Sequence, residues 1–148
     1  AVACYLKAVE NDSTNASAWN NRGVIYKEKE LYDKAIQCYM MALQFDSGHR
    51  TATTNLAVAF TDLGTKLKAG GHLTQALDRY YEALHTDPTY SPCLYNLGVI
   101  LSEMGESTQA MQMYLEAIKL NPRYVESYNN MGAICKNMGH VRLNIYII

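Results

Sequence analysis

The sequence predicts an all-α fold, a solenoid of helix-turn-helix repeats, and three observations lead to this prediction. A pattern of glycine, alanine and tyrosine recurs about every 34 residues along the 148-residue chain. Within each repeat, apolar residues twice follow the i, i+4, i+7 spacing of a single helix face. Proline follows Asp87 and Asn121, where it ends a helix because it disfavours helical geometry in the residue before it.

The repeat is clearest when AWNNRGVIYKEKELYDKAIQCYMMAL is aligned with CLYNLGVILSEMGESTQAMQMYLEAI. We number the places of each repeat so that the shared glycine, Gly23 or Gly98, is at place 8. Alanine then holds places 20 and 27, and tyrosine holds place 24. In this frame Ala57 is at place 8 of the repeat between them. Small residues at places 8 and 20 let the two helices of a repeat approach closely, and stacked repeats bury the remaining apolar faces.

Repeats account for the whole chain as one array over residues 1–148. We predict the second half of a repeat, three complete repeats and an incomplete repeat with an atypical tail, at residues 1–15, 16–49, 50–90, 91–124 and 125–148. The first of these segments should hold a second helix at 1–10. The last should begin with a first helix at 126–138.

The middle repeat is seven residues longer than the others, and in this frame the surplus follows its first helix. Seven residues make about two helical turns and rotate the helix face by only about 20°. We therefore predict a long first helix from about 51 to 69 that overhangs its neighbours and ends at Gly70. Gly64 opposes this helix by about 1 kcal/mol, while Asp62 and Lys66 offer an i, i+4 ion pair. The apolar stripe continues through Leu56, Phe60, Leu63 and Leu67.

This pattern resembles the tetratricopeptide repeat, a 34-residue helix-turn-helix unit. The resemblance covers nearly the whole chain. It implies a right-handed α-solenoid whose first helices line a concave groove that binds protein segments.

Place 6 is asparagine in every repeat that contains it, at Asn21, Asn55, Asn96 and Asn130. Place 6 lies two residues from the packing glycine, about 200° around the helix, so we predict that it points away from the partner helix. An amide carries donors and an acceptor, and a ladder of amides can bracket the main chain of an extended peptide. Asparagine is also common at this place in tetratricopeptide repeats generally, so a purely structural role stays open.

The residues predicted to flank this ladder are of mixed charge, namely Lys27, Glu28, Asp62 and Glu103. A groove that grips a C-terminal carboxylate needs lysine and arginine on successive first helices. The corresponding places here hold asparagine, threonine, tyrosine or valine, which leaves Lys27 and Lys136 as the main candidates. The sequence therefore disfavours that binding mode.

Composition disfavours several other classes of function. The net charge is −1 and the 13 lysine and arginine residues are scattered, so we expect no nucleic-acid partner. No apolar run approaches the roughly 18 residues of a membrane helix, so we expect no membrane partner. The four cysteines lack the spacing of a zinc site, and no group of residues suggests a catalytic site.

A closer resemblance follows from the long first helix. The string AVAFTDLGTKLKAGGHLTQAL, with YNLGVILSEMG and YNNMGAICKNMG after it, resembles the repeat region of the SPINDLY-type protein O-glycosyltransferases. That family implies an enzyme of the nucleus and cytoplasm that transfers fucose or N-acetylglucosamine to Ser or Thr of proteins, in plants within gibberellin signalling. Its repeats recruit protein substrates and allow self-association, and a separate domain binds the donor, GDP-fucose or UDP-GlcNAc.

Two hypotheses follow from the sequence. The first is a substrate-recruiting segment of a SPINDLY-like glycosyltransferase, with catalysis outside this chain, so whether the chain is part of an enzyme stays open. The alternative is a scaffold of a multiprotein complex that has no link to glycosylation. The coding sequence downstream of Ile148 separates them, because a transferase domain supports the first and further repeats support the second.

Overall fold

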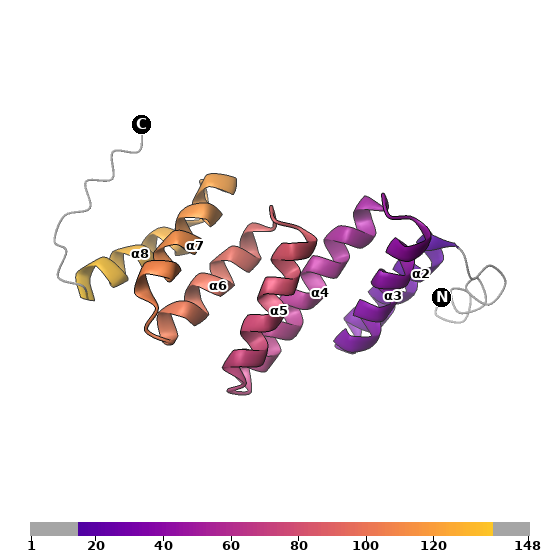
Figure 1. The fold of residues 1–148 in the computed structure, drawn as a ribbon, viewed down its shortest axis with the longest axis horizontal. Helices are drawn as coiled ribbons and strands as arrows, with labels where there is room; N and C mark the ends of the chain where they lie inside the picture. Colours follow the sequence, from indigo (N-terminus) through magenta and orange to yellow (C-terminus); the bar gives the residue numbers. More distant parts are fainter. Residues whose placement is uncertain (1–14, 138–148) are drawn as a thin grey trace. The chain divides into compact units, whose positions relative to one another are not determined.

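The computed structural model describes residues 15–137 of the chain (Figure 1). Seven helices occupy this range, and no strand lies within it, which confirms the predicted all-α class. The helices are α2 (Ala16–Glu28), α3 (Tyr32–Phe45), α4 (Arg50–Ala69), α5 (Leu73–Thr86), α6 (Ser91–Glu103), α7 (Ser107–Leu120) and α8 (Val125–Asn137). The helix predicted at 1–10 and the tail after Asn137 lie outside the described residues.

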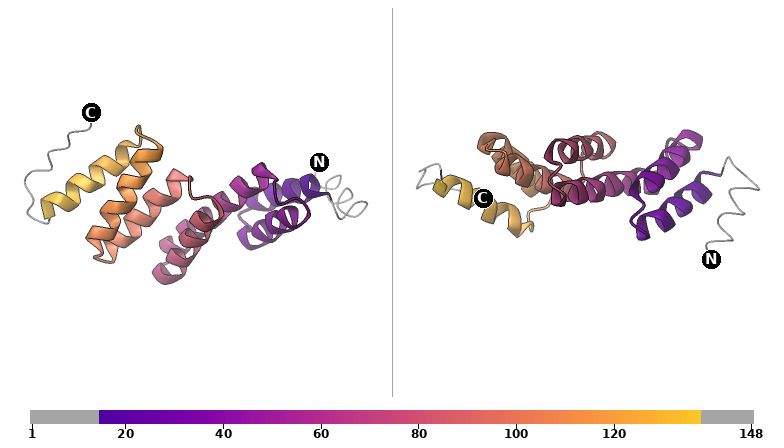
Figure 2. Two further views of the ribbon diagram at one scale, coloured as in Figure 1. Left: turned by 45° about the horizontal axis from the view of Figure 1, so that its top comes forward. Right: turned by 90° about the horizontal axis from the view of Figure 1, so that it is seen from below.

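The chain divides into two compact units, residues 1–90 and 91–148. In the first unit α2 pairs with α3 and α4 pairs with α5, while α3 also packs on α4. In the second unit α6 pairs with α7, which also packs on α8. Figure 2 shows from two further directions that the paired helices are antiparallel hairpins. None of the helices within 15–137 combines the length and apolarity needed to cross a membrane.

Each complete hairpin is closed by a glycine of its first helix lying against a tyrosine of its second. A Cβ atom added to the glycine would lie 2.5 to 2.8 Å from the nearest tyrosine ring carbon in each hairpin. The three tyrosine rings are at most 1% exposed. The pairs are Gly23 with Tyr39, Gly64 with Tyr80, and Gly98 with Tyr114. The alanines at places 20 and 27 are completely buried beside them, at Ala35, Ala42, Ala76, Ala83, Ala110 and Ala117.

The prediction that Ala57 holds the packing place of the middle repeat is wrong. Gly64 is the residue that faces Tyr80, and the interval of 16 residues between them equals the interval in the other two hairpins. The seven extra residues therefore precede the packing glycine, in the first half of α4. The frame failed because Ala57 keeps the 34-residue spacing toward the preceding repeat, whereas the hairpin contact follows its own spacing.

Helix α4 consequently packs in two registers. It begins one residue before the predicted start and runs unbroken through Gly64 to Ala69. Toward the preceding hairpin it keeps the regular spacing, with the Asn55 Nδ2 donating to the Asn20 Oδ1 at 3.0 Å. Toward α5 its register is set by Gly64. The two registers differ by seven residues, and because seven residues rotate a helix by only about 20° from two full turns, α4 keeps one apolar face for both.

The offset changes where α4 projects. Because Gly64 pairs with Tyr80, the first two turns of α4 extend past the end of α5. A polar recess of about 460 Å³ lies there, lined by Gly48, Arg50, Thr53, Thr54 and the segment from Thr86 to Thr89.

The other end of α4 lies beside the turn between α2 and α3. Lys66 Nζ is 3.3 Å from Glu30 Oε2 and 5.5 Å from the centre of the Tyr32 ring. Asp62 is paired instead with Lys27. The Asp62 and Lys66 pair suggested by the sequence is therefore absent from the described residues, because both side chains are engaged by the preceding hairpin.

We predict that Gly64→Ala destabilises the protein by about 1–3 kcal/mol, because the added Cβ would lie 2.8 Å from the Tyr80 ring and 3.2 Å from the Ala76 carbonyl oxygen. Gly132→Ala is the matched control, since a Cβ there meets no atom within 4 Å and alanine favours a helix by about 1 kcal/mol over glycine. Denaturant unfolding followed by circular dichroism measures both. Equal effects of the two substitutions would refute the close contact at Gly64.

Candidate functional site

The four place-6 asparagines lie on the four first helices α2, α4, α6 and α8, and all are half-buried. They fall into two kinds. Asn21 and Asn96 make no side-chain hydrogen bond within the described part of the chain. Asn55 and Asn130 donate hydrogen bonds to the hairpin that precedes them.

The Asn55 amide joins two first helices. Its Nδ2 donates to the Oδ1 of Asn20, which is 5% exposed at place 5 of α2. The sequence analysis did not single out Asn20. The signal that could have found it is the polar residue at place 5, which a first helix can present to place 6 of the next repeat.

The Asn130 amide makes the equivalent contact and one more. Its Nδ2 donates to the hydroxyl of Tyr95 at 3.4 Å, and Tyr95 is at place 5 of α6. It also donates to the hydroxyl of the buried Tyr114 at 3.3 Å. Both amide hydrogens are used, which leaves the Oδ1 as the group available to a ligand. The ring of Tyr95 packs against Tyr114 and Tyr124, with centroids 5.9 and 5.1 Å apart, and this fixes its hydroxyl.

The equivalent tyrosine of the first unit has a different environment. Tyr39 precedes Asn55 by the same 16 residues that separate Tyr114 from Asn130. Its hydroxyl is nevertheless buried without a hydrogen-bond partner in the described residues. Burial raises the pKa of Tyr39 to about 12, with smaller contributions from Cys38, Asp62 and Glu28. Burial also raises the pKa of Tyr114, and the hydrogen bond from Asn130 opposes that increase.

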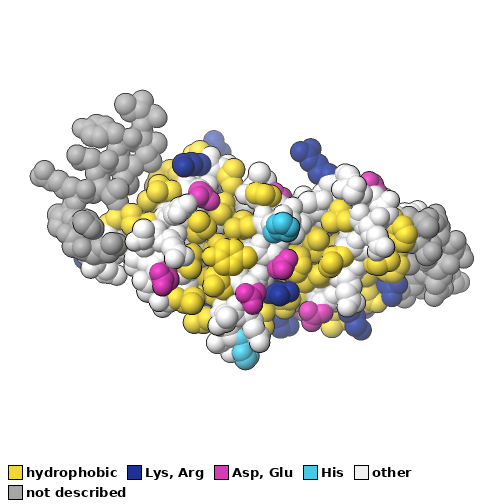
Figure 3. Space-filling view, in the orientation of Figure 1, with side chains coloured by type: hydrophobic (Ala, Val, Ile, Leu, Met, Phe, Trp, Pro, Cys, Tyr) yellow, Lys and Arg dark blue, Asp and Glu magenta, His cyan; other side chains and the backbone are white. Residues whose placement is uncertain are grey.

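The predicted flanking residues do not form a strong field of either sign. Lys27 Nζ lies 3.4 Å from Asp62 Oδ2, so this cation and this anion compensate each other between α2 and α4. Glu28 and Glu103 are exposed at the ends of their helices. On the face drawn in Figure 3, acidic and basic side chains are interspersed among apolar ones. No group of three or more His, Cys, Asp or Glu residues within 15–137 is placed to hold a metal ion.

Comparison with protein families identifies the repeat directly. One family model of the tetratricopeptide repeat matches residues 16–49 and 91–124, and a second matches residues 113–142. Together these ranges cover more than half of the chain.

A curated relative from Hordeum vulgare, a probable UDP-N-acetylglucosamine–peptide N-acetylglucosaminyltransferase SPINDLY, is 40% identical to this chain over 96 residues. The match covers 65% of the chain and 10% of the relative. The chain therefore spans about a tenth of the length of the relative.

Solved structures share the fold. MamA superposes with a TM-score of 0.64 at 22% identity, over 94% of this chain and 77% of MamA. YrrB, described as a tetratricopeptide protein with an unusual peptide-binding site, has a TM-score of 0.57 at 17% identity, over 96% and 87%. The first tetratricopeptide domain of Spaghetti, bound to the HSP90 peptide SRMEEVD, has a TM-score of 0.55 at 22% identity, over 86% and 96%.

We predict that removing the two tyrosine hydroxyls has different effects. Tyr114→Phe should lower the free energy of unfolding by about 1 kcal/mol, because the Asn130 amide loses one acceptor. Tyr39→Phe should be neutral or stabilising by up to about 1 kcal/mol, because its buried hydroxyl has no partner in the described residues. Denaturant unfolding of both variants checks this, and a larger loss for Tyr39→Phe would contradict it.

We also predict that the Tyr39 hydroxyl makes the protein sensitive to alkali. Its pKa is raised from 10.0 to about 12 on folding, so the folded state disfavours the phenolate. The resulting stability is fully present below pH 10, and it falls by up to about 1.4 kcal/mol per pH unit as the pH rises from 10 to 12. Unfolding free energies measured across this range should decline less steeply for Tyr39→Phe than for the wild-type chain, and parallel declines would exclude Tyr39 as the source.

Proposed function

Because the chain belongs to the tetratricopeptide repeat family, we propose that it is a protein-interaction segment that holds extended peptide segments of protein substrates. The first helices supply the contact surface, and the place-6 asparagines supply hydrogen bonds to the main chain of the peptide. The side chains of the peptide contribute less, so the segment accepts varied sequences.

The observation that carries this proposal is the division of the asparagines into two kinds. Asn21 and Asn96 have no side-chain hydrogen bond within the described residues, and each offers both donors and an acceptor. Asn55 and Asn130 are fixed by the preceding hairpin, so their side chains lose little conformational entropy when a ligand binds. Asn130 offers its Oδ1 and accordingly accepts a peptide N–H.

The resemblance to SPINDLY supports a more specific role. We assign this segment to substrate recruitment for a protein O-glycosyltransferase, with the sugar transferred by a domain outside this chain. The 40% identity to the Hordeum vulgare relative supports this assignment. GDP-fucose or UDP-GlcNAc as donor, Ser or Thr as acceptor, a nuclear and cytoplasmic location, self-association and a part in gibberellin signalling come with the same proposal.

Gripping a C-terminal carboxylate is a poorer hypothesis for this chain. That mode needs lysine or arginine side chains that are free to meet the carboxylate. Lys27, one of the two candidates, is already paired with Asp62. A carboxylate ligand would have to displace Asp62, whereas a neutral peptide main chain would not.

A scaffold without a link to glycosylation is the alternative. Both functions use the same peptide-binding surface, so the binding surface alone does not separate them. The sugar-transfer assay below does, because only the recruitment function couples this segment to catalysis.

The test changes Asn21 and Asn96 to Ala in the full-length protein that carries this segment. These two amides have no structural hydrogen bond in the described residues, so folding should be unaffected. Two lost hydrogen bonds of about 0.5–1.5 kcal/mol each should lower apparent affinity for protein substrates by roughly tenfold. The measurement is the rate of sugar transfer to an intact protein substrate, alongside the rate for a short acceptor peptide that contacts only the transferase domain.

The matched control changes Gln75 and Gln109 to Ala, two exposed amides at place 19 of α5 and α7. Recruitment predicts a slower reaction with the intact protein, an unchanged reaction with the short peptide, and no effect of the control. Unchanged modification of the intact protein by the asparagine variant would exclude the ladder role. Absence of any sugar transfer by the full-length protein would favour the scaffold.

A further inference from the structure

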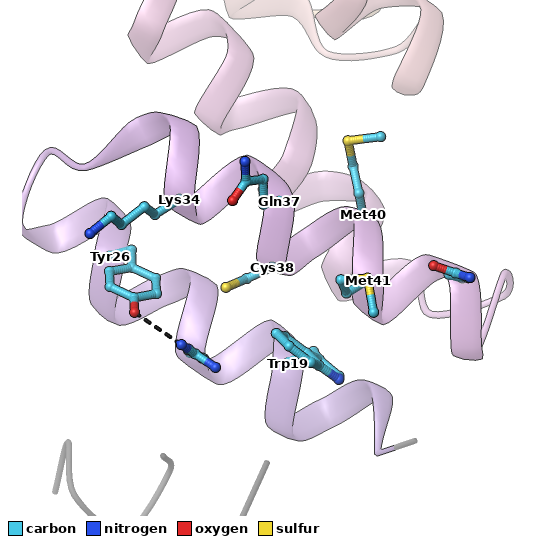
Figure 4. Close-up of a pocket in the computed structure, with 9 residues that line it drawn as sticks. Trp19, Tyr26, Lys34, Gln37, Cys38, Met40 and Met41 are labelled. Atoms are coloured by element: carbon cyan, nitrogen blue, oxygen red, sulfur yellow. Dashed lines mark hydrogen bonds between the residues drawn. The ribbon is translucent and has the colours of Figure 1, made fainter. Parts of the chain in front are cut away.

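The hairpin of α2 and α3 has a hollow of about 820 Å³ that we call the α2–α3 hollow. Its lining includes Trp19, Arg22 and Tyr26 of α2, and Cys38 and Met41 of α3 (Figure 4). The Arg22 guanidinium carbon lies 5.4 Å from the centre of the Trp19 ring and 5.5 Å from that of Tyr26. Arg22 Nη2 donates to the Tyr26 hydroxyl, but its Nε is buried without a hydrogen-bond partner among the described residues.

Equivalent places of other first helices are covered by a second helix that comes before them. In α4, which packs on α3, places 7 and 11 are Leu56 and Phe60, at 6% and 7% exposure. In α8, which packs on α7, they are Met131 and Cys135, at 4% and 7%. In α2 the same places are Arg22 and Tyr26, which are only half-buried. The hollow is therefore the contact face for a preceding second helix.

We infer that residues 1–10 form that second helix and cover the α2–α3 hollow, which makes the hollow an internal packing site and not a site for an external ligand. These residues lie outside the described part of the structure. The inference rests on the connection to α2 and on the pattern of residues 1–10.

The connection has the form of the turns that lead into α4 and α8. Asp46 lies four residues before α4 and Asn121 lies four residues before α8. The side-chain oxygen of each accepts the backbone N–H two residues later, at 3.0 Å from Gly48 N and 3.2 Å from Arg123 N. Asp12 lies four residues before α2. The chain therefore has the residue that this turn needs, in the position that reverses its direction onto α2.

The pattern of residues 1–10 matches the described second helices. Ala1, Tyr5 and Ala8 precede Asp12 by the intervals at which Ala35, Tyr39 and Ala42 precede Asp46. Val2 and Val9 then fall at places 21 and 28, which are apolar in every second helix.

Places 21 and 28 are the ones covered by the helix that follows. Ile36 of α3 and Ile118 of α7 hold these places and are each 8% exposed, and each of these helices packs on a following first helix. In α5, the last helix of its unit, Leu77 and Leu84 are only half-buried. Val2 and Val9 are accordingly the side chains that would enter the α2–α3 hollow.

Trp19 makes the inference directly testable, because it is the single tryptophan of the chain and it lines the hollow. The test variant combines Val2→Gln with Val9→Gln in the full chain. The control variant combines Ala3→Gln with Lys7→Gln, at places 22 and 26, which carry exposed polar residues in α5. Both variants carry two glutamines, so they differ in the face of the helix that is changed.

The measurement is acrylamide quenching of Trp19 fluorescence, with circular dichroism as the check that the helices remain. The valine variant should raise the quenching constant by roughly twofold and shift emission to longer wavelength, because the cover opens locally. The control should match the wild-type chain. Equal quenching in all three chains would overturn the inference. So would light scattering that shows a dimer whose dissociation, and not the valine substitutions, exposes Trp19, since a second copy would then be the cover.

Discussion

The contact of a glycine in one helix with a tyrosine in the next is the constraint on which this structure depends. At Gly23, Gly64 and Gly98 the tyrosine ring occupies the space where a Cβ would lie, which brings the two helices of a hairpin close together. The ring then fills the space between fully buried alanines. Because the small and large residues alternate between the helices, the hairpin has one register. A slip by one turn would leave a ring without space and a glycine without a neighbour.

That constraint explains how α4 accommodates seven additional residues. The glycine and tyrosine stay 16 residues apart, so the hairpin with α5 is unchanged in itself. The contacts with the preceding hairpin keep the regular repeat spacing, through Asn55 with Asn20 and Asp62 with Lys27. The additional residues therefore separate two interfaces along a single continuous helix. Two turns is an insertion that allows this, because it returns the apolar face nearly to its original direction.

The asparagines connect this packing to the proposed function. In Asn55 and Asn130 the amide N–H groups join successive repeats, and in Asn130 they also satisfy a buried tyrosine hydroxyl. The place that could bind a peptide is therefore also a structural place, which accounts for its recurrence in every repeat. The two alternatives that the sequence left open for these asparagines are thus not exclusive. Asn21 and Asn96 separate them, since they carry the same side chain without the structural hydrogen bond.

The sequence by itself determined the helical class, the positions of the buried alanines and tyrosines, and a long helix ending near Ala69. These follow from spacing along one chain, because a helix face and a 34-residue repeat are both periodic in sequence. Only the tertiary structure decided that Gly64 and not Ala57 faces Tyr80, that Asp62 pairs with Lys27, and that Asn20 and Tyr95 hold two of the predicted site residues. Each of these depends on which residue of a neighbouring helix lies opposite, and when one helix follows two registers, spacing along the sequence does not specify the partner.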